Sequence, residues 1–460
     1  MSHSLFPRGT ARSVRLRLEC FEDRAQPSTG SAIHLNMIAH PAGAVGPSGG
    51  LDPAEVRHAY GFDRLPDDGA GQTIAIVVAY DDPNIGKDLA TFDQTFGLPA
   101  PPKFTKAFVP GTPVDGGWSG ETALDIEWAH AIAPKANLLL VEAKSASTQD
   151  LLSAVDYARK QPGVSVVSMS WGGSEFANEA AKDGIFTTPA GHTPVAFIAA
   201  AGDSGAGAEW PAASPNVLAV GGTRVWVSSD GSYAAETGWS GSGGGFSRVF
   251  SAPAYQATSV SGARGIPDVA YDADPQSGFS VYSSVPDSSG QAGWMVVGGT
   301  SAGAPQWAGL IALADQERAA HGQAALGRVA DQIYQLSGRD FHDITVGGNG
   351  YTAGPGYDLV TGRGTPIADL LVPDLAGVAP PVTPTPPAPN SPPSGTTGGG
   401  TGTGTGTTNQ PPTSGISAPV WYIPGFGFGF GFGFGFNFGG LFGWTTGWGQ
   451  PYRGPLFNWC

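Results

Sequence analysis

The pattern of hydrophobic and polar residues is most regular between residues 51 and about 376 of the 460-residue chain. Short runs of apolar, often β-branched residues alternate there with helix-like segments. The runs lack polar alternation, as strands buried on both faces of a parallel sheet do. They are TIAIVVAY from Thr73, ANLLLVEA from Ala136, VSVVSMSWG from Val164, PVAFIAAAGDSG from Pro194 and NVLAVGG from Asn216. The expected helices are ETALDIEWAHAIA, TQDLLSAVDYARKQ and APQWAGLIALADQERAA. This alternation predicts one α/β domain with helices on both faces of the sheet.

The flanking segments show no such pattern. Residues 1–50 are polar and interrupted by Gly and Pro, so we expect a disordered leader. Residues 377–419 are a Pro/Thr/Gly linker with too few apolar residues to offset the entropy of ordering. In residues 420–460, Gly alternates with Phe, so an extended chain would present its rings on one face. This tail is either disordered or a segment that associates with itself or with a surface.

Composition narrows the function classes. The net charge is −15, which disfavours a nucleic-acid partner because the field of the protein would repel phosphates. No run of about 18 apolar residues predicts a transmembrane helix. The two cysteines, Cys20 and Cys460, form no disulfide framework or metal-site pattern. The acidic balance, with a short segment RLRLECFEDRAQPS that resembles a motif ahead of some exported bacterial proteins, favours an extracellular or cell-surface location.

The stretch GGTSAGAPQW, from Gly298 to Trp307, contains a candidate nucleophile, Ser301, among small residues. A serine hydroxyl needs a base within hydrogen-bond reach to become a nucleophile. The segment Gly299 to Gly303 satisfies the G-x-S-x-G elbow of α/β-hydrolases, and His321 and His342 follow it, but no HGGG-type loop precedes it.

Two other serine-hydrolase patterns fit less of the chain. The GDSG that begins at Gly202 is similar to the chymotrypsin motif, but no His-then-Asp order in an all-β pattern accompanies it. Subtilisin-type enzymes share Gly-Thr-Ser and a proline four residues after the serine, here Pro305. They also need a histidine in an H-G-T context, which none of the eight histidines has.

A pair of carboxylates offers another base. Glu121 and Asp125 lie one helical turn apart, so both project from one face and can share a proton. His130 lies about 140° from Asp125 and about 180° from Glu121 around the helix, so it faces elsewhere. A solvated helix face is the ordinary reading of such a pair, but the residues around it are largely apolar.

These segments together resemble the sedolisins, the serine-carboxyl peptidases, over about residues 51–376. The resemblance rests on nine blocks in family order: PAEVRHAYGF, GQTIAIVVAYDDPNI, ETALDIEWAHAIAP, VSMSWGG, AAAGDSG, SGGGFSRVFSAPAYQ, IPDVAYDADP, GGTSAGAPQW and FHDITVGGNG with AGPGYDLVTGRGTP. It implies a subtilisin-like parallel sheet with helices on both faces. It also implies Ser301 as nucleophile, Glu121 as general base and then acid, Asp125 as the support of Glu121, and Asp203 as the residue facing the oxyanion.

These implied roles set a condition on pH. A carboxylate cannot donate a hydrogen bond, so Asp203 must be protonated when the oxyanion forms. Glu121 must be ionised to accept a proton, so activity should follow a bell at acid pH.

The resemblance also implies one Ca²⁺ ion. Its ligands would be the carboxylates of Asp343 and Asp358 and the carbonyl oxygens of Ile344, Gly354 and Gly356. This is the all-oxygen shell that calcium prefers. Without the resemblance, two aspartates in a Gly-rich loop are more often residues that cap their own turns.

The sequence thus predicts an acid-active serine endopeptidase that acts on protein or peptide substrates through an acyl-enzyme on Ser301. One alternative is a catalytically silent surface or adhesion protein that uses the Gly/Phe tail. The other is an esterase of the α/β-hydrolase type. Subsite preference, and endopeptidase against tripeptidyl-peptidase action, stay open.

Overall fold

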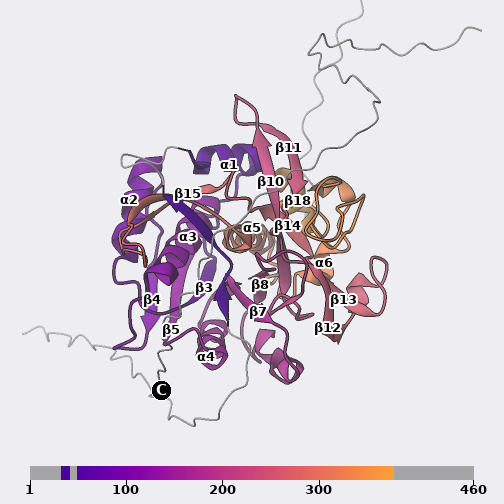
Figure 1. The fold of residues 1–460 in the computed structure, drawn as a ribbon, viewed down its shortest axis with the longest axis horizontal. Helices are drawn as coiled ribbons and strands as arrows, with labels where there is room; N and C mark the ends of the chain where they lie inside the picture. Colours follow the sequence, from indigo (N-terminus) through magenta and orange to yellow (C-terminus); the bar gives the residue numbers. More distant parts are fainter. Residues whose placement is uncertain (1–32, 42–48, 378–460) are drawn as a thin grey trace, which may run out of the picture. The chain divides into compact units, whose positions relative to one another are not determined.

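The computed structural model describes residues 33–41 and 49–377 (Figure 1). The linker, the Gly/Phe tail and both cysteines lie outside the described residues, so their assignments stay predictions. Among the described residues, no helix has the length and apolar character needed to cross a membrane.

A mainly parallel sheet forms the centre of the fold (Figure 1). In spatial order its strands are β11 (Tyr233–Gly238), β10 (Leu218–Val227), β8 (Ala196–Ala200), β6 (Val164–Met169), β3 (Thr73–Ala79), β5 (Asn137–Ala143) and β4 (Phe104–Phe108). A further strand, β14 (Val269–Asp272), also pairs with β10. Every pair is parallel except that of β10 with β11. All five apolar runs form strands, which confirms the predicted parallel sheet.

Helices cover both faces of this sheet. Two of them, α3 (Gly116–Ile132) and α5 (Thr300–Ala320), pack against each other and against the central strands. A third, α4 (Thr148–Arg159), packs on β3, β5 and β6 from the opposite face. Residues Ile74 to Ala79 of β3 are therefore buried at every position. In the part of the chain that the structure describes, the other helices are α1 (Pro53–Tyr60), α2 (Ile85–Phe96), α6 (Ala330–Ile333) and α7 (Ala368–Ala376), with 3₁₀ turns at Phe62–Arg64, Glu179–Phe186, Ala254–Gln256 and Gly338–Asp340.

Helix α3 begins five residues before the segment that the sequence predicts. The Asp115 side chain caps it by accepting the Trp118 N–H at 3.0 Å, and the helix ends at Ile132, two residues before Pro134. Every residue from Trp118 to Ile132 is buried, as expected of a helix that is apolar on all sides. Its acidic residues are therefore inside the protein.

Helix α5 begins directly after Gly299, whose φ of 111° is the left-handed region that favours glycine. Its first sixteen residues, Thr300 to Asp315, are all buried. Ser301 thus lies on the first turn of a helix that runs through the core beside α3.

Within the described residues, four smaller sheets accompany the central one. In spatial order, their strands are β1 (His34–Leu35) with β7 (Trp171–Ser174) and β9 (Glu209–Trp210); β15 (Phe279–Ser283) with β16 (Gly293–Gly298) and β2 (Ile38–Pro41); β12 (Gly245–Ser251) with β13 (Ala263–Ile266); and β17 (Phe341–His342) with β18 (Thr365–Pro366).

Part of the expected leader is ordered, so the prediction of disorder is wrong for residues 33–41. The strands β1 and β2 lie within it and pair with β7 and β16. They are two and four residues long, too short to produce a hydrophobic period in the sequence. Their backbone groups are satisfied by distant strands instead.

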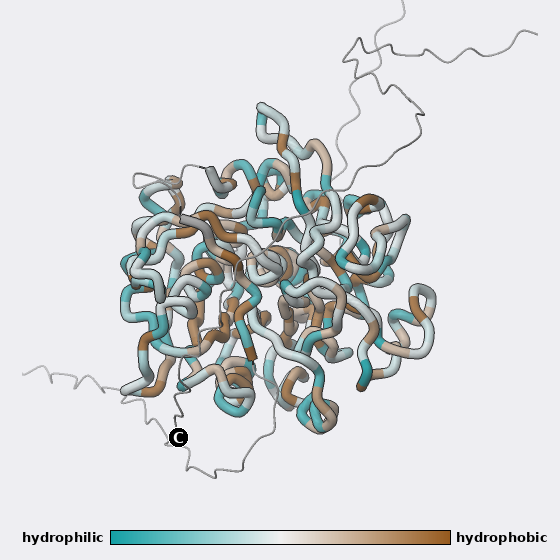
Figure 2. Tube along the Cα trace, in the orientation of Figure 1, coloured by the Kyte–Doolittle hydropathy of each residue, from teal (hydrophilic) through white to brown (hydrophobic). Residues whose placement is uncertain are grey.

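Hydrophobic residues (brown) follow the central strands, and hydrophilic residues (teal) are frequent in the outer loops (Figure 2). The core includes the fully buried side chains of Trp128, Trp171, Trp210 and Trp307. The indole nitrogen of Trp171 donates to the carbonyl of Val77 at 2.9 Å, so this side chain belongs to the core.

Candidate active site

Ser301 is hydrogen-bonded to two other segments of the chain, at Ser170 and at Asn36. It is fully buried on the first turn of α5, and its Oγ donates to the carbonyl oxygen of Ser170 at 3.2 Å. Its backbone N–H donates to the carbonyl oxygen of Asn36 at 3.0 Å. The free N–H groups of a helix N-terminus favour negative charge. The position therefore suits a nucleophile whose reaction creates an oxyanion.

Glu121 and Asp125 lie beside Ser301 on α3. Both residues are 0% exposed. Burial raises the pKa of the Glu121 carboxyl, the charge of Asp125 raises it further, and the Ser301 hydroxyl opposes the shift. The structure thus brings together the serine and the carboxylate pair, which are 180 residues apart in the sequence.

Ser170 connects this pair to the nucleophile, and the sequence analysis did not identify it. Its hydroxyl donates to Asp125 Oδ1 at 2.6 Å, while its carbonyl oxygen accepts from Ser301. It directly follows β6, in the block SMSWGG. A single serine at a strand end carries no pattern of its own, so only its hydrogen bonds to Asp125 on α3 and Ser301 on α5 reveal this role.

The electrostatics of the pair favour the protonated carboxyl. Burial raises the pKa of both carboxyls; the charge of Asp125 raises the pKa of Glu121 further, and the Ser170 hydroxyl opposes the shift at Asp125. Both oxygens of Glu121 and Oδ2 of Asp125 have no hydrogen-bond partner among the described residues. Two buried carboxylates cannot both ionise without a large cost, so burial favours at least one proton on the pair.

Asp203 lies on the loop after β8 and reaches the start of α5. Its Oδ1 accepts from both the N–H and the hydroxyl of Thr300, each at 2.8 Å. Its Oδ2 is buried without a partner among the described residues. Burial raises the pKa of Asp203 to about 7, although the Thr300 contacts oppose the shift. A protonated Oδ2 would be a hydrogen-bond donor next to Ser301.

Position 299 requires glycine because the Asn36 carbonyl and Asp203 both approach it. A Cβ on this residue would lie 2.3 Å from the Asn36 carbonyl oxygen and 2.4 Å from Asp203 Oδ2. Only glycine leaves room for both oxygens to approach the start of α5.

The histidines considered as bases lie elsewhere. His130 is buried on α3, where its Nε2 contacts the carbonyl oxygen of Pro99 at 2.7 Å and Asp93 at 3.3 Å. His342 stacks on Tyr233, and His321 contacts the carbonyl of Glu317 at the other end of α5 from Ser301. The strand before Ser301, β16, belongs to a small antiparallel sheet, whereas an α/β-hydrolase elbow follows a strand of the central sheet.

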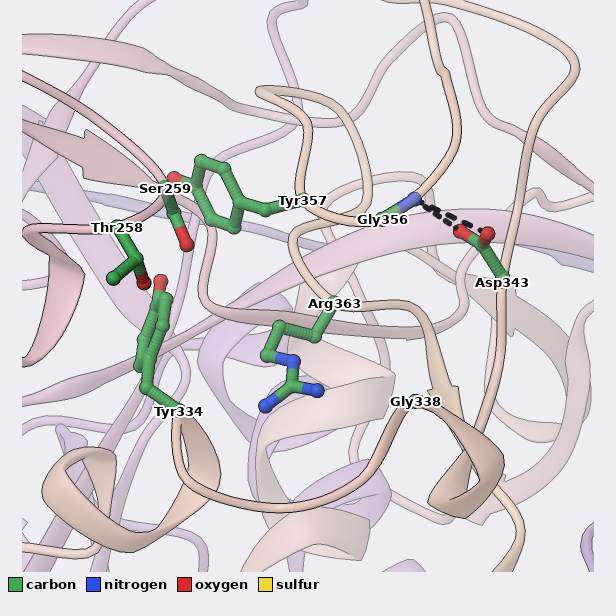
Figure 3. A pocket seen from close by; sticks show the side chains of 8 residues that line it. All are labelled: Thr258, Ser259, Tyr334, Gly338, Asp343, Gly356, Tyr357 and Arg363. Carbon is green, nitrogen blue, oxygen red and sulfur yellow. Dashed lines mark hydrogen bonds between the residues drawn. The ribbon is translucent and has the colours of Figure 1, made fainter.

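The two aspartates of the expected calcium loop approach one glycine turn. Asp343 accepts from the Gly356 N–H through both oxygens, at 3.0 and 3.1 Å (Figure 3). Asp358 Oδ2 accepts from the Gly354 N–H at 3.0 Å, and its Oδ1 accepts from the N–H groups of Val360 and Thr361. The turn-capping role that the sequence analysis left open is therefore present.

Residues 111–330 match the model of the Subtilase family. The chain is 37% identical over 365 residues to kumamolisin of Bacillus sp. (strain MN-32), an alignment that covers 70% of this chain and 62% of kumamolisin. It is 28% identical over 372 residues to sedolisin of Pseudomonas sp. (strain 101), covering 70% of this chain and 60% of sedolisin. The solved structure of Pseudomonas sedolisin, described as a serine-carboxyl proteinase complexed with pseudo-iodotyrostatin, aligns with a TM-score of 0.63 and 27% identity. The chain belongs to the sedolisin family.

The alignment with that sedolisin structure covers 72% of this chain and 99% of the sedolisin chain, so the subtilisin-like fold is confirmed for the sedolisin domain. The chain spans about three fifths of the length of the two curated sedolisin relatives.

Proposed function

We propose that this chain is an acid-active serine endopeptidase with Ser301 as nucleophile and Glu121 as general base. The observation that carries the proposal is that Ser170 links Ser301 to the buried Glu121–Asp125 pair: its carbonyl oxygen accepts from Ser301 Oγ at 3.2 Å, and its hydroxyl donates to Asp125 Oδ1 at 2.6 Å. The described residues His130, His321 and His342 make their contacts elsewhere. A buried carboxylate pair can hold one proton, so Glu121 can accept the hydroxyl proton while Asp125 stays protonated.

The reaction would proceed in two steps, acylation of Ser301 and then hydrolysis of the acyl-enzyme. Ser301 Oγ attacks the substrate carbonyl carbon and its proton moves to Glu121. Glu121 then gives this proton to the leaving amine, and an acyl-enzyme remains on Ser301. Water, activated by Glu121, releases the acid. The N–H of Ser301 and a protonated Asp203 Oδ2 would stabilise the oxyanion in both halves.

A fluorophosphonate probe tests this function directly. We expect the probe to label Ser301 of the wild type, and the wild type to hydrolyse a denatured protein at acid pH. The variant Ser301→Ala should do neither. Ser204, in the GDSG segment, is the matched control: Ser204→Ala should keep both properties because this residue is exposed and outside the pair. Labelling that survives Ser301→Ala would contradict the proposal.

A single Ca²⁺ ion, held by Asp343, Asp358 and the carbonyls of Ile344, Gly354 and Gly356, is part of the proposal. The donors are hard oxygens, and both carboxylates already approach the Gly354–Gly356 turn. No three His, Cys, Asp or Glu side chains converge among the described residues, so carbonyl oxygens would complete the shell. Asp343 and Gly356 line a cavity of about 270 Å³, and Figure 3 shows the Arg363 guanidinium pointing away from Asp343. When bound, the ion would fix this loop and take no part in the reaction.

Removal of calcium should lower thermal stability. An ion present at about 100 times its Kd contributes about 2.7 kcal/mol, so a chelator should lower the Tm by several degrees. The variant Asp343→Asn should lose this sensitivity, whereas Asp287→Asn, at an exposed loop position outside the site, should keep it. Calorimetry with and without chelator measures both. A Tm unaffected by chelator, together with no calcium in the purified protein, would contradict the site.

We also propose that the enzyme acts outside the cell or at its surface. The support is the net charge of −15 and the N-terminal segment RLRLECFEDRAQPS.

A further inference from the structure

Thr300 connects two segments that carry candidate catalytic residues. It is the first residue of α5, directly before Ser301, and it is 0% exposed. From the loop after β8, Asp203 accepts hydrogen bonds from Thr300, and the neighbouring Gly202 N–H donates to its hydroxyl oxygen. Thr300 therefore links the loop that carries Asp203 to the helix that carries Ser301.

Both polar groups of Thr300 bind the same oxygen of Asp203. The Thr300 N–H and the Thr300 hydroxyl each donate to Asp203 Oδ1 at 2.8 Å. A carboxylate oxygen has two lone-pair sites, and these two donors use both sites of Oδ1. A proton on the carboxyl group is therefore directed to the other oxygen, Oδ2.

The orientation of the Thr300 hydroxyl is restricted by its surroundings. Its oxygen accepts the Gly202 N–H at 3.1 Å, and the Gly202 carbonyl oxygen, at 3.2 Å, is the other acceptor within reach of its single hydrogen. The contact with Asp203 Oδ1 is shorter, and a carboxylate is the stronger acceptor. The β-branched side chain also restricts rotation about χ1. The hydroxyl is thus held ready to donate to Oδ1.

The second oxygen of Asp203 faces the start of α5. Asp203 Oδ2 lies 2.4 Å from the position that a Cβ of Gly299 would take, two residues before Ser301. It is buried and has no hydrogen-bond partner among the described residues. A buried polar atom without a partner is costly, which points to a partner that arrives with the substrate. The oxyanion formed during attack by Ser301 would be that partner.

Charged groups on three other elements also act on Asp203 or respond to it. Burial raises the pKa of Asp203 to about 7, and the two hydrogen bonds from Thr300 oppose the shift. Glu209 on β9 raises this pKa and His34 on β1 lowers it, both by less. On α3, the charge of Asp203 raises the pKa of Glu121. Net charge sets how readily the carboxyl group is protonated, whereas donors at Oδ1 decide which oxygen holds the proton.

We propose that Thr300 is a positioning residue that keeps the proton of Asp203 on Oδ2, where it can be donated to the oxyanion. This inference rests on the proposed peptidase function. In acylation and in hydrolysis of the acyl-enzyme, Oδ2–H would donate to the oxyanion while Thr300 holds Oδ1, and no bond forms or breaks at Thr300. Without the hydroxyl, a proton on Oδ1 is no longer disfavoured, and a proton there is directed away from the oxyanion.

The variant Thr300→Val removes the hydroxyl and keeps the branched shape. Its kcat on a peptide substrate should fall by about tenfold or more with KM little changed, because the oriented donor acts in the transition state. Its loss of activity on the alkaline side should shift to higher pH by about 0.5–1 unit, since one hydrogen bond fewer to the carboxylate raises the pKa of Asp203 further. A general loss of packing would lower activity without this shift.

Three further variants of the full chain serve as controls. Thr300→Ser keeps the hydroxyl and should retain the wild-type pH profile, with kcat within a few-fold. Thr223→Val removes another buried threonine hydroxyl, which donates to Glu236 Oε1 at 2.8 Å, and should change neither kcat nor the pH profile by more than a small amount. In Asp203→Asn, adding Thr300→Val should leave the alkaline side of the profile where it is, because residue 203 no longer titrates.

Steady-state kinetics from about pH 3 to about pH 8, with fluorophosphonate labelling of Ser301 and circular dichroism on the same samples, separate the two hypotheses. A wild type that neither reacts with the probe nor hydrolyses peptide would overturn the proposed function. An active wild type whose Thr300→Val variant keeps the wild-type kcat, or loses activity at lower pH, would overturn the role of Thr300 and leave the function standing. Equal losses in Thr300→Ser and Thr300→Val would assign the effect to packing and overturn the role as well.

Discussion

Replacing Glu121 with Gln is expected to lower kcat/KM on a peptide substrate at acid pH by at least about 10⁴-fold, the loss seen when one member of a serine-hydrolase catalytic unit is removed. Gln has the shape of Glu but cannot accept the Ser301 proton. It also cannot share a proton with Asp125, whose Oδ2 has no partner among the described residues. Steady-state kinetics measure the loss, and circular dichroism checks that the fold persists.

The chain supplies a matched control for this substitution. Glu127 lies on the same helix α3, is also 0% exposed, and has a pKa that burial raises. Its Oε2 accepts from the Tyr282 N–H at 3.0 Å, a contact that a Gln oxygen can keep. Glu127→Gln should therefore retain activity within a few-fold. Equal losses in the two variants would mean that a buried acid on α3 is needed for folding and would remove the evidence for Glu121 as the base.

The strands and helices that border the site could be predicted because each is long and buried on all sides. Such a segment is apolar throughout, so the carboxylates of Glu121 and Asp125 stand out against Leu124 and Ile126 in the sequence. Their spacing of four residues then gives one face of a helix. Physical reasoning on α3 alone therefore found the pair. Its contact with Ser301 needed the family resemblance.

Ser170 and residues 33–41 could not be found in this way, because their roles depend on tertiary contacts. Ser170 acts through a hydroxyl and a carbonyl that reach two different helices. The strand β1 is two residues long and pairs with residues more than 130 positions away. Sequence patterns report periodicity within a segment, and neither feature has any.

Replacing Asp203 with Asn is expected to remove most of the loss of activity on the alkaline side of the pH profile. Burial raises the pKa of Asp203 to about 7, so in the wild type its protonated, donating form is present below about pH 7 and is lost as the pH rises through that value. Above it, a carboxylate would also repel the developing oxyanion. Asn donates a hydrogen bond at every pH, so the fall of kcat/KM on the alkaline side should shift to higher pH. The fall on the acid side, which is set by the Glu121–Asp125 pair, should occur at the same pH as in the wild type.

The size of the effect can be separated from a general loss of stability. Asp203→Ala removes the donor and should cost about 10²- to 10³-fold at every pH where the wild type is active, whereas Asp203→Asn should lose less. Asp315 provides the control for pH: burial also raises its pKa to about 7, but it lies far along α5, where it accepts from the Leu326 N–H at 2.8 Å. Asp315→Asn should keep the wild-type alkaline limb. If instead Asp315→Asn shifts the alkaline limb as far as Asp203→Asn does, the loss of activity at high pH reflects unfolding caused by ionisation of buried acids. The proposed oxyanion role of Asp203 would then be wrong.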